Sequence, residues 1–149
     1  MNPINLEEFA FNVAGEICLA NDRLRFNLLP PFLVGGEHAQ DVCWVYLWVK
    51  MNTDPPESQV CYVGKAGKTM MDRCRAHTSG FVRSVTGRRH AARIREFLAG
   101  SDQRRLKVYA RKSLDGDLLG ENGISLCEAE ERAMIAKCRR FDVNLWNAN

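Results

Sequence analysis

Two runs decide the fold of this chain: Trp44-Val45-Tyr46 and Tyr62-Val63-Gly64, whose tyrosines lie 16 positions apart. Each run belongs to a longer segment, Val42 to Val49 and Gln59 to Val63, that is rich in the aromatic and β-branched residues typical of strands. Between these segments, Asn52 to Glu57 holds two prolines, which mark a loop. The pattern predicts a β-hairpin whose two strands are joined by a long loop.

A helix is expected directly after this hairpin. Gly64 ends the second strand, Thr69 is a residue type that caps helices, and Asp72 stands at the capping-box position three residues later. The helix then runs to about His77. Because Arg73 and His77 are four positions apart, their side chains share one face of this helix.

Periodicity and chain breakers predict the remaining elements. They are an N-terminal helix over Leu6 to Leu19, a helix over Arg88 to Leu98 ended by Gly100, a strand over Arg105 to Lys112, a loop over Gly116 to Gly123, and a helix over Ser125 to Arg140 with Ser125 as its N-cap. The expected fold class is α/β (α+β), with a small three-stranded antiparallel sheet flanked by helices and an additional N-terminal helix. Residues 1–149 are expected to form one domain, with an N-terminal helical extension over 1–41 and a core over 42–149.

Composition bounds the class of protein. A chain of 149 residues with 46% hydrophobic and 26% charged residues has the size and composition of one folded globular domain. It has no long apolar stretch and no secretory signal, so we expect a soluble, cytoplasmic protein that does not enter a membrane. In that compartment the cysteines stay reduced, and their spacing does not predict a structural zinc site. The six are Cys18, Cys43, Cys61, Cys74, Cys127 and Cys138.

Charge is distributed unevenly along the chain. Residues 62–112 hold 14 Lys and Arg against three acids, a local balance of +11, whereas the whole chain carries only +3. This excess is not compensated nearby, and a surface that binds a polyanion explains it better than an ordinary solvated helix face does. The sequence therefore favours a nucleic-acid partner.

The two runs, the Arg-x-x-x-His spacing and the order of the elements together resemble the GIY-YIG nuclease superfamily. The resemblance covers about Cys43 to Asn147. It departs from the family at Trp44, where glycine is usual, at Val63, where isoleucine is usual, and in a spacing from Tyr62 to Arg73 that is one residue longer. It implies a stand-alone, metal-dependent endonuclease that hydrolyses phosphodiester bonds in DNA, of a restriction type or associated with a mobile element or phage.

The resemblance also implies roles for particular residues. Two strand tyrosines would meet in one cleft, one of them as a base. An arginine would stabilise the phosphoryl charge, a histidine would move a proton or orient a tyrosine, a glutamate would hold Mg²⁺ or Mn²⁺, and an asparagine would complete the set. In this chain the six positions are Tyr46, Tyr62, Arg73, His77, Glu131 and Asn147.

Three assignments within this set stay open. Glu128 is the alternative metal ligand, Asn144 is the alternative to Asn147, and either tyrosine can be the base. Basic residues of the central segment are candidates for contacts with nucleic acid. They are Lys65, Lys68, Arg75, Arg88, Arg89 and Arg93.

The partner is expected to be DNA rather than RNA, and a homodimer, with the N-terminal helix as its interface, would let the enzyme cut both strands. Two rival functions remain at this level. One is a catalytically silent nucleic-acid-binding module with the same basic surface, and the other is a protein-interaction domain whose basic face meets an acidic partner. Salt-dependent binding to unrelated DNA sequences would separate the nucleic-acid functions from the last one.

Overall fold

The computed structural model describes residues 4–33, 43–67 and 69–147, and these residues have a mixed α+β architecture. Its two short 3-10 helices are η1 (Glu7–Phe9) and η2 (Pro30–Phe32). The strands are β1 (Asn12–Ala20), β2 (Arg23–Leu28), β3 (Trp44–Thr53), β4 (Pro56–Ala66), β5 (Arg104–Lys112), β6 (Asp115–Leu118) and β7 (Glu121–Ser125). The α-helices are α1 (Met70–Arg83), α2 (Val85–Ala99) and α3 (Cys127–Arg140).

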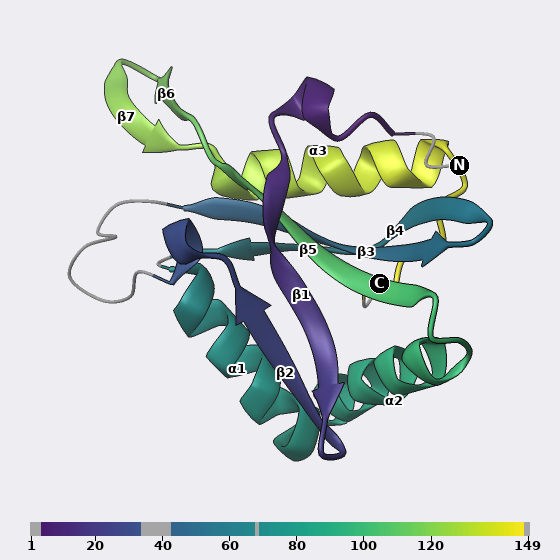
Figure 1. Cartoon of the computed structure of the whole chain (residues 1–149). Helices are drawn as coiled ribbons and strands as arrows, with labels where there is room; N and C mark the ends of the chain where they lie inside the picture. Colours follow the sequence, from purple (N-terminus) through teal and green to yellow (C-terminus); the bar gives the residue numbers. More distant parts are fainter. Residues whose placement is uncertain (1–3, 34–42, 68, 148–149) are drawn as a thin grey trace.

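Five of the strands form one antiparallel sheet in the order β2-β1-β5-β3-β4. Helices α1 and α2 lie on one face of this sheet and α3 lies on the other, while the β6–β7 hairpin projects away from it (Figure 1). Strand β3 has a neighbour on each side, so that Tyr46 faces Gly64 of β4 and Ala110 of β5. Strand β4 is an edge strand of the sheet.

A hydrophobic core lies on each face of the sheet. The core under α1 and α2 includes the rings of Tyr46, Trp48 and Tyr62, and the core under α3 includes Leu47 and Val63. Because both faces are covered, β3 is apolar at almost every position rather than at alternate ones. The two tyrosines that the sequence singles out therefore point to the same face, toward α1.

Several predicted elements are confirmed. The predicted hairpin is β3–β4, although its strands are longer and its loop shorter than expected, and the predicted strand over Arg105 to Lys112 is β5. Thr69 caps α1, where its side chain accepts a hydrogen bond from the Asp72 N–H at 2.9 Å. The last helix begins at Cys127, and Ser125 is the final residue of β7, so the prediction of Ser125 as its N-cap was wrong.

The predicted N-terminal helix over Leu6 to Leu19 was wrong, because this segment contributes η1 and most of β1. With β2, strand β1 adds two strands to the predicted three-stranded sheet, so the sheet has five. A two-residue turn joins them at Asn21 and Asp22, both with positive φ, which these residue types tolerate. The expected dimer interface on an N-terminal helix is therefore lost as well.

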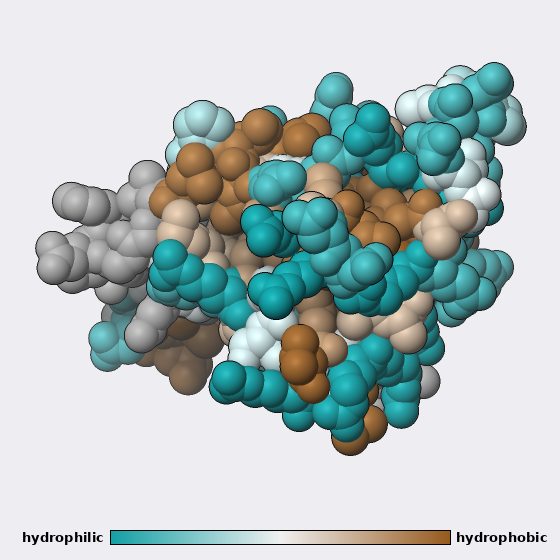
Figure 2. Space-filling model, turned by 60° about the horizontal axis from the view of Figure 1, so that its bottom comes forward, coloured by the Kyte–Doolittle hydropathy of each residue, from teal (hydrophilic) through white to brown (hydrophobic). Residues whose placement is uncertain are grey.

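The predicted loop over Gly116 to Gly123 was also wrong in part, since it contains most of the β6–β7 hairpin. Among the described residues, no helix is long and apolar enough to cross a membrane. Figure 2 brings the lower side of Figure 1 forward, and hydrophilic residues cover most of that side, with hydrophobic ones in separate patches. Exposed arginines on α1 and α2 carry much of the basic charge of the central segment. They are Arg75, Arg83, Arg88, Arg89 and Arg95.

A disulfide joins Cys43, which precedes β3, to Cys127, the first residue of α3. The expectation that all six cysteines are reduced was therefore wrong for this pair, whereas Cys18, Cys61, Cys74 and Cys138 are free thiols. The two bonded cysteines are 84 positions apart, and only the packing of α3 against the start of β3 brings them together. The bond ties the first turn of α3 to the strand that carries Tyr46.

Candidate active site

The phenol of Tyr46 contacts two polar residues of α1, Arg73 and His77. Its oxygen accepts a hydrogen bond from Arg73 Nε at 3.0 Å and lies 2.5 Å from His77 Nε2. A guanidinium only donates, so the Tyr46 oxygen accepts from Arg73, whereas the tautomer of the His77 ring sets which partner donates in the contact with His77. Burial, together with Arg73 and His90, lowers the pKa of His77 to about 3, so this ring is neutral near pH 7.

Gly64 makes room for this phenol. A Cβ on Gly64 would lie 2.5 Å from both Cζ and the hydroxyl oxygen of Tyr46, its partner on the neighbouring strand. The sequence places Gly64 at the end of a strand, but β4 continues to Ala66, so that prediction was wrong. The glycine is needed because the aromatic ring crosses directly over it.

Tyr62 lies beside Tyr46 on the same face of the sheet, with 6.0 Å between the ring centroids. Its ring stacks on Trp48 at 4.2 Å and has His77 at 5.6 Å on one edge and His90 at 5.3 Å on another. Tyr46 is only 1% exposed, and burial and Tyr62 raise its pKa well above the ordinary value. Tyr46 is therefore a protonated phenol that fixes its neighbours.

Arg73 is oriented by the two tyrosines. Its Nε donates to the Tyr46 hydroxyl at 3.0 Å, and Tyr62 also interacts with its guanidinium. The guanidinium forms no ion pair with an acidic residue in the described part of the chain. A guanidinium held in this way presents two parallel N–H donors, which match two oxygens of a phosphate.

The three acids at the start of α3 differ in their partners. Glu128 pairs with Lys65 at 3.7 Å and Arg132 at 3.0 Å, and Glu130 pairs with Arg111 at 2.9 Å. The carboxylate of Glu131 has no such partner within residues 4–33, 43–67 and 69–147. It is the acid that remains available to a ligand.

Glu131 also lies within electrostatic reach of Arg73. Burial raises the pKa of Glu131, while the charges of Lys65 and Arg73 act in the opposite direction. The described residues contain no cluster of three or more metal-ligating side chains. A lone, half-buried carboxylate fits a hard ion such as Mg²⁺, which keeps several waters and takes phosphate oxygens as further ligands.

The side-chain amide of Asn147 forms two hydrogen bonds with the backbone of the edge strand β4. Its side-chain oxygen accepts from the Val63 N–H at 2.9 Å, and its side-chain nitrogen donates to the Val63 C=O at 2.6 Å. Next to it, the Trp146 N–H donates to the Cys61 C=O at 2.6 Å. The amide of Asn147 thus holds the C-terminal segment beside Tyr62. Asn144, the alternative in the sequence, lies earlier in that segment and is exposed.

The structure scatters the basic residues proposed to meet nucleic acid. Lys65 and Arg75 pair with acids, Arg75 with Asp72 at 3.9 Å, and Arg88 donates to the Val82 C=O at 3.4 Å. Lys68 lies outside the described residues. Arg89 and Arg93 come together in one cavity with Arg139, which the sequence reasoning missed together with Trp48 and His90.

One of these missed residues, Trp48, had a signal in the sequence. Trp48 follows Tyr46 by two positions, which places both rings on one face of a strand. Arg139 stands in the last turn of the C-terminal helix, but no pattern ties that turn to the helix that carries His90.

Comparisons of the chain with protein-family models, with curated proteins and with solved structures find no match.

Proposed function

We propose that this protein is a metal-dependent endonuclease of the GIY-YIG type that hydrolyses phosphodiester bonds in DNA. The observation that carries the proposal is the contact of one phenol, Tyr46, with both Arg73 and His77, beside the phenol of Tyr62. These four residues come from three separate elements, and the resemblance predicts that they act together. A basic surface on α1 and α2 supports an anionic polymer as the substrate.

The residues divide into those that would touch the substrate and those that position them. Arg73 turns its terminal nitrogens to the scissile phosphate and stabilises the negative charge that builds up there. Tyr46, which is 1% exposed, holds Arg73 through Nε, and His77 contacts the same phenol from α1. Tyr62, which is less buried than Tyr46, is then the tyrosine that would take the proton of the attacking water as its phenolate. The water oxygen bonds to phosphorus as the bond to the leaving sugar oxygen breaks, and that oxygen takes a proton from solvent.

Glu131 would hold the divalent ion, Mg²⁺ or Mn²⁺. The ion would supply Lewis-acid stabilisation of the phosphate when bound. Glu128 is the weaker candidate because Lys65 and Arg132 already occupy its oxygens. Asn147 holds the edge strand beside Tyr62 and is a positioning residue.

The test is incubation of purified protein with supercoiled plasmid in Mg²⁺ or Mn²⁺, with EDTA as the metal-free control. We expect nicked or linear product, which Glu131→Gln abolishes while binding to DNA in EDTA stays within about twofold of the unaltered protein. Glu128→Gln is the matched control, because it makes the same charge change one helical turn away and should leave cutting nearly intact.

Loss of cutting in Glu128→Gln but not in Glu131→Gln would move the metal to Glu128. DNA binding without metal-dependent cutting of any plasmid would refute the nuclease and favour the catalytically silent binding module.

A further inference from the structure

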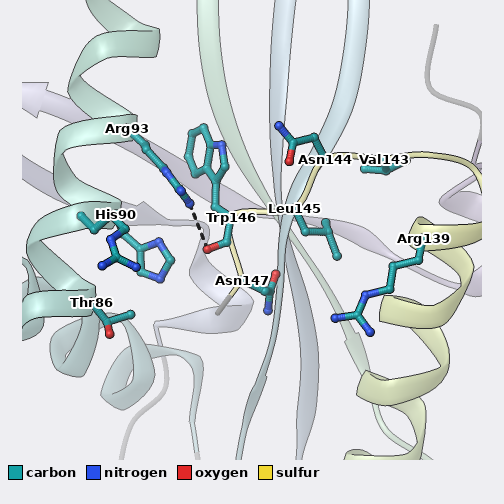
Figure 3. Close-up of a pocket in the computed structure, with 10 residues that line it drawn as sticks. Thr86, His90, Arg93, Arg139, Val143, Asn144, Leu145, Trp146 and Asn147 are labelled. Atoms are coloured by element: carbon teal, nitrogen blue, oxygen red, sulfur yellow. Dashed lines mark hydrogen bonds between the residues drawn. The ribbon is translucent and has the colours of Figure 1, made fainter. Parts of the chain in front are cut away.

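A cavity of about 460 Å³ lies between α2, α3 and the C-terminal segment. Figure 3 shows His90 and Arg93 extending into it from α2, Arg139 from α3, and residues 143–147 crossing between the two helices. Thr86, in the first turn of α2, also lines it, so the positive end of that helix faces the cavity. The hollow thus joins α2 to two neighbouring segments near the C-terminus that are distant from it in sequence.

The cavity is positively charged and its charge is not compensated. Arg89, Arg93 and Arg139 line it, and no acidic residue is among its lining residues. Arg93 donates to the Trp146 C=O at 3.2 Å, whereas the guanidinium groups of Arg89 and Arg139 make no hydrogen bond or ion pair with residues that the structure describes. Three such cations around one hollow favour an anion between them.

His90 gives a second, independent sign of a missing ligand. This residue is only 5% exposed, yet its Nδ1 is buried and has no hydrogen-bond partner among the described residues. Buried polar atoms are nearly always paired, so an unpaired one on a residue that lines a cavity calls for a missing partner such as a water or an ion. Burial and the charges of Arg93 and Arg89 lower the pKa of His90, an effect that an anion in the cavity would oppose.

The cavity adjoins the candidate active site. The ring of Tyr62 contacts both histidines, with centroid distances of 5.6 Å to His77 of the candidate active site and 5.3 Å to His90 of the cavity. Asn147 lines the cavity and binds the backbone of Val63, the neighbour of Tyr62. A ligand in the cavity and a phosphate at Arg73 would therefore both lie close to Tyr62.

We propose that this cavity is a second phosphate site, which holds a backbone phosphate of the nucleic acid next to the one that is cut. Arg89 of α2 and Arg139 of α3 would donate hydrogen bonds to the oxygens of this phosphate, and Arg93 of α2 also lines the site. The site sets which phosphate reaches Arg73, because it fixes the strand beside Tyr62. The identity of the ligand as nucleic acid rests on the proposed function, whereas the anion site itself rests on the cavity alone.

The test compares two double variants with the same change in charge. Arg89→Gln with Arg139→Gln alters the cavity. Both side chains are exposed and make no hydrogen bond or ion pair within residues 4–33, 43–67 and 69–147, so the fold should be kept. Arg23→Gln with Arg25→Gln is the control on β2, which lies at the opposite edge of the sheet from β4. Binding of a short fluorescent DNA duplex is measured by anisotropy in EDTA, at NaCl concentrations from about 50 to 200 mM.

We expect the cavity variant to bind DNA about tenfold more weakly at low salt. The slope of log K against log[NaCl] is negative, and its magnitude should decrease by about 1, as for the loss of one phosphate contact. The control variant should keep the slope of the unaltered protein. Equal effects of the two variants would overturn the proposal, because the loss would then reflect net charge alone.

Inorganic phosphate provides a separate readout. Titration of the metal-free protein should shift the imidazole NMR signals of His90, and the cavity variant should lose that shift. A phosphate-dependent shift with no change in the DNA slope would refute the nucleic-acid ligand and leave a site for a free phosphate compound. Absence of plasmid cutting, together with a reduced slope in the cavity variant, would refute the nuclease but uphold the cavity.

Discussion

Replacing Gly64 with alanine is the sharpest test of the geometry at Tyr46. The new Cβ would lie 2.5 Å from two atoms of the Tyr46 phenol, far inside van der Waals contact. The ring is 1% exposed and packed on both sides, so it cannot move without cost. Any shift of the phenol also lengthens its hydrogen bonds to Arg73 and His77.

The expected loss of stability follows from two opposing terms. Overpacking a filled core costs about 1–3 kcal/mol, whereas alanine in a strand gains about 0.5–1 kcal/mol over glycine. The net result is a loss of about 1–2 kcal/mol in the free energy of unfolding, measured by urea denaturation with an unchanged m-value. Cutting of plasmid by Gly64→Ala should fall as well, because Arg73 loses its fixed orientation.

Gly67→Ala is the matched control. An added Cβ there meets no atom within 4 Å, and alanine should leave stability unchanged or raise it by up to about 1 kcal/mol. If Gly64→Ala were as stable as the unaltered protein, or more stable, the close approach of Tyr46 to this glycine would be refuted.

Three further predictions concern stability. Arg111→Met should cost about 2–3 kcal/mol in urea unfolding, because it leaves the largely buried carboxylate of Glu130 without its partner. Reduction of the disulfide between Cys43 and Cys127 should lower the melting temperature, since the bond closes a loop with a separation of 84 residues and such bonds contribute up to about 4 kcal/mol. Stability should also fall as the pH drops from 6.5 toward 3, by up to about 1.4 kcal/mol per unit, because the pKa of His77 is 6.5 ordinarily and about 3 in the fold, so the unfolded chain binds the proton first. His77→Gln should flatten this dependence.

Each of these predictions has an internal comparison. Arg132→Met breaks the exposed pair with Glu128 and should cost less than about 0.5 kcal/mol, so equal losses at the two arginines would contradict the buried pair. A Cys43→Ser variant should not respond to a reducing agent. An unchanged pH profile in His77→Gln would mean that other groups cause the acid sensitivity.

Local signals predicted the parts of the site that lie close together in sequence. Thr69 and Asp72 fixed the start of α1, and the four-residue spacing of Arg73 and His77 placed both on the face that meets Tyr46. Capping and side-chain periodicity act over one or two turns, so a sequence is enough to find them. These features positioned the central cluster correctly.

Features that depend on distant contacts were not predictable in the same way. The spacing of Phe9, Val13 and Ile17 fits a helix, but the segment pairs as a strand because β2 and β5 lie on its two sides. Gly15 was the missed signal, since its Cα comes so close to the backbone of Asn27 that no side chain would fit. The disulfide and the arginine cavity likewise form only when α3 packs beside β3 and α2.

The N-terminal hairpin β1–β2 lies outside the segment that resembles the nuclease superfamily, yet it contacts the candidate active site. The ring of Phe26 on β2 lies 6.0 Å from His77 and 6.1 Å from Trp48, measured between ring centroids. Burial is the largest cause of the low pKa of His77, and this ring supplies part of it. The neutral state of His77, the ring that contacts the hydroxyl of Tyr46, therefore depends in part on residues outside Cys43 to Asn147.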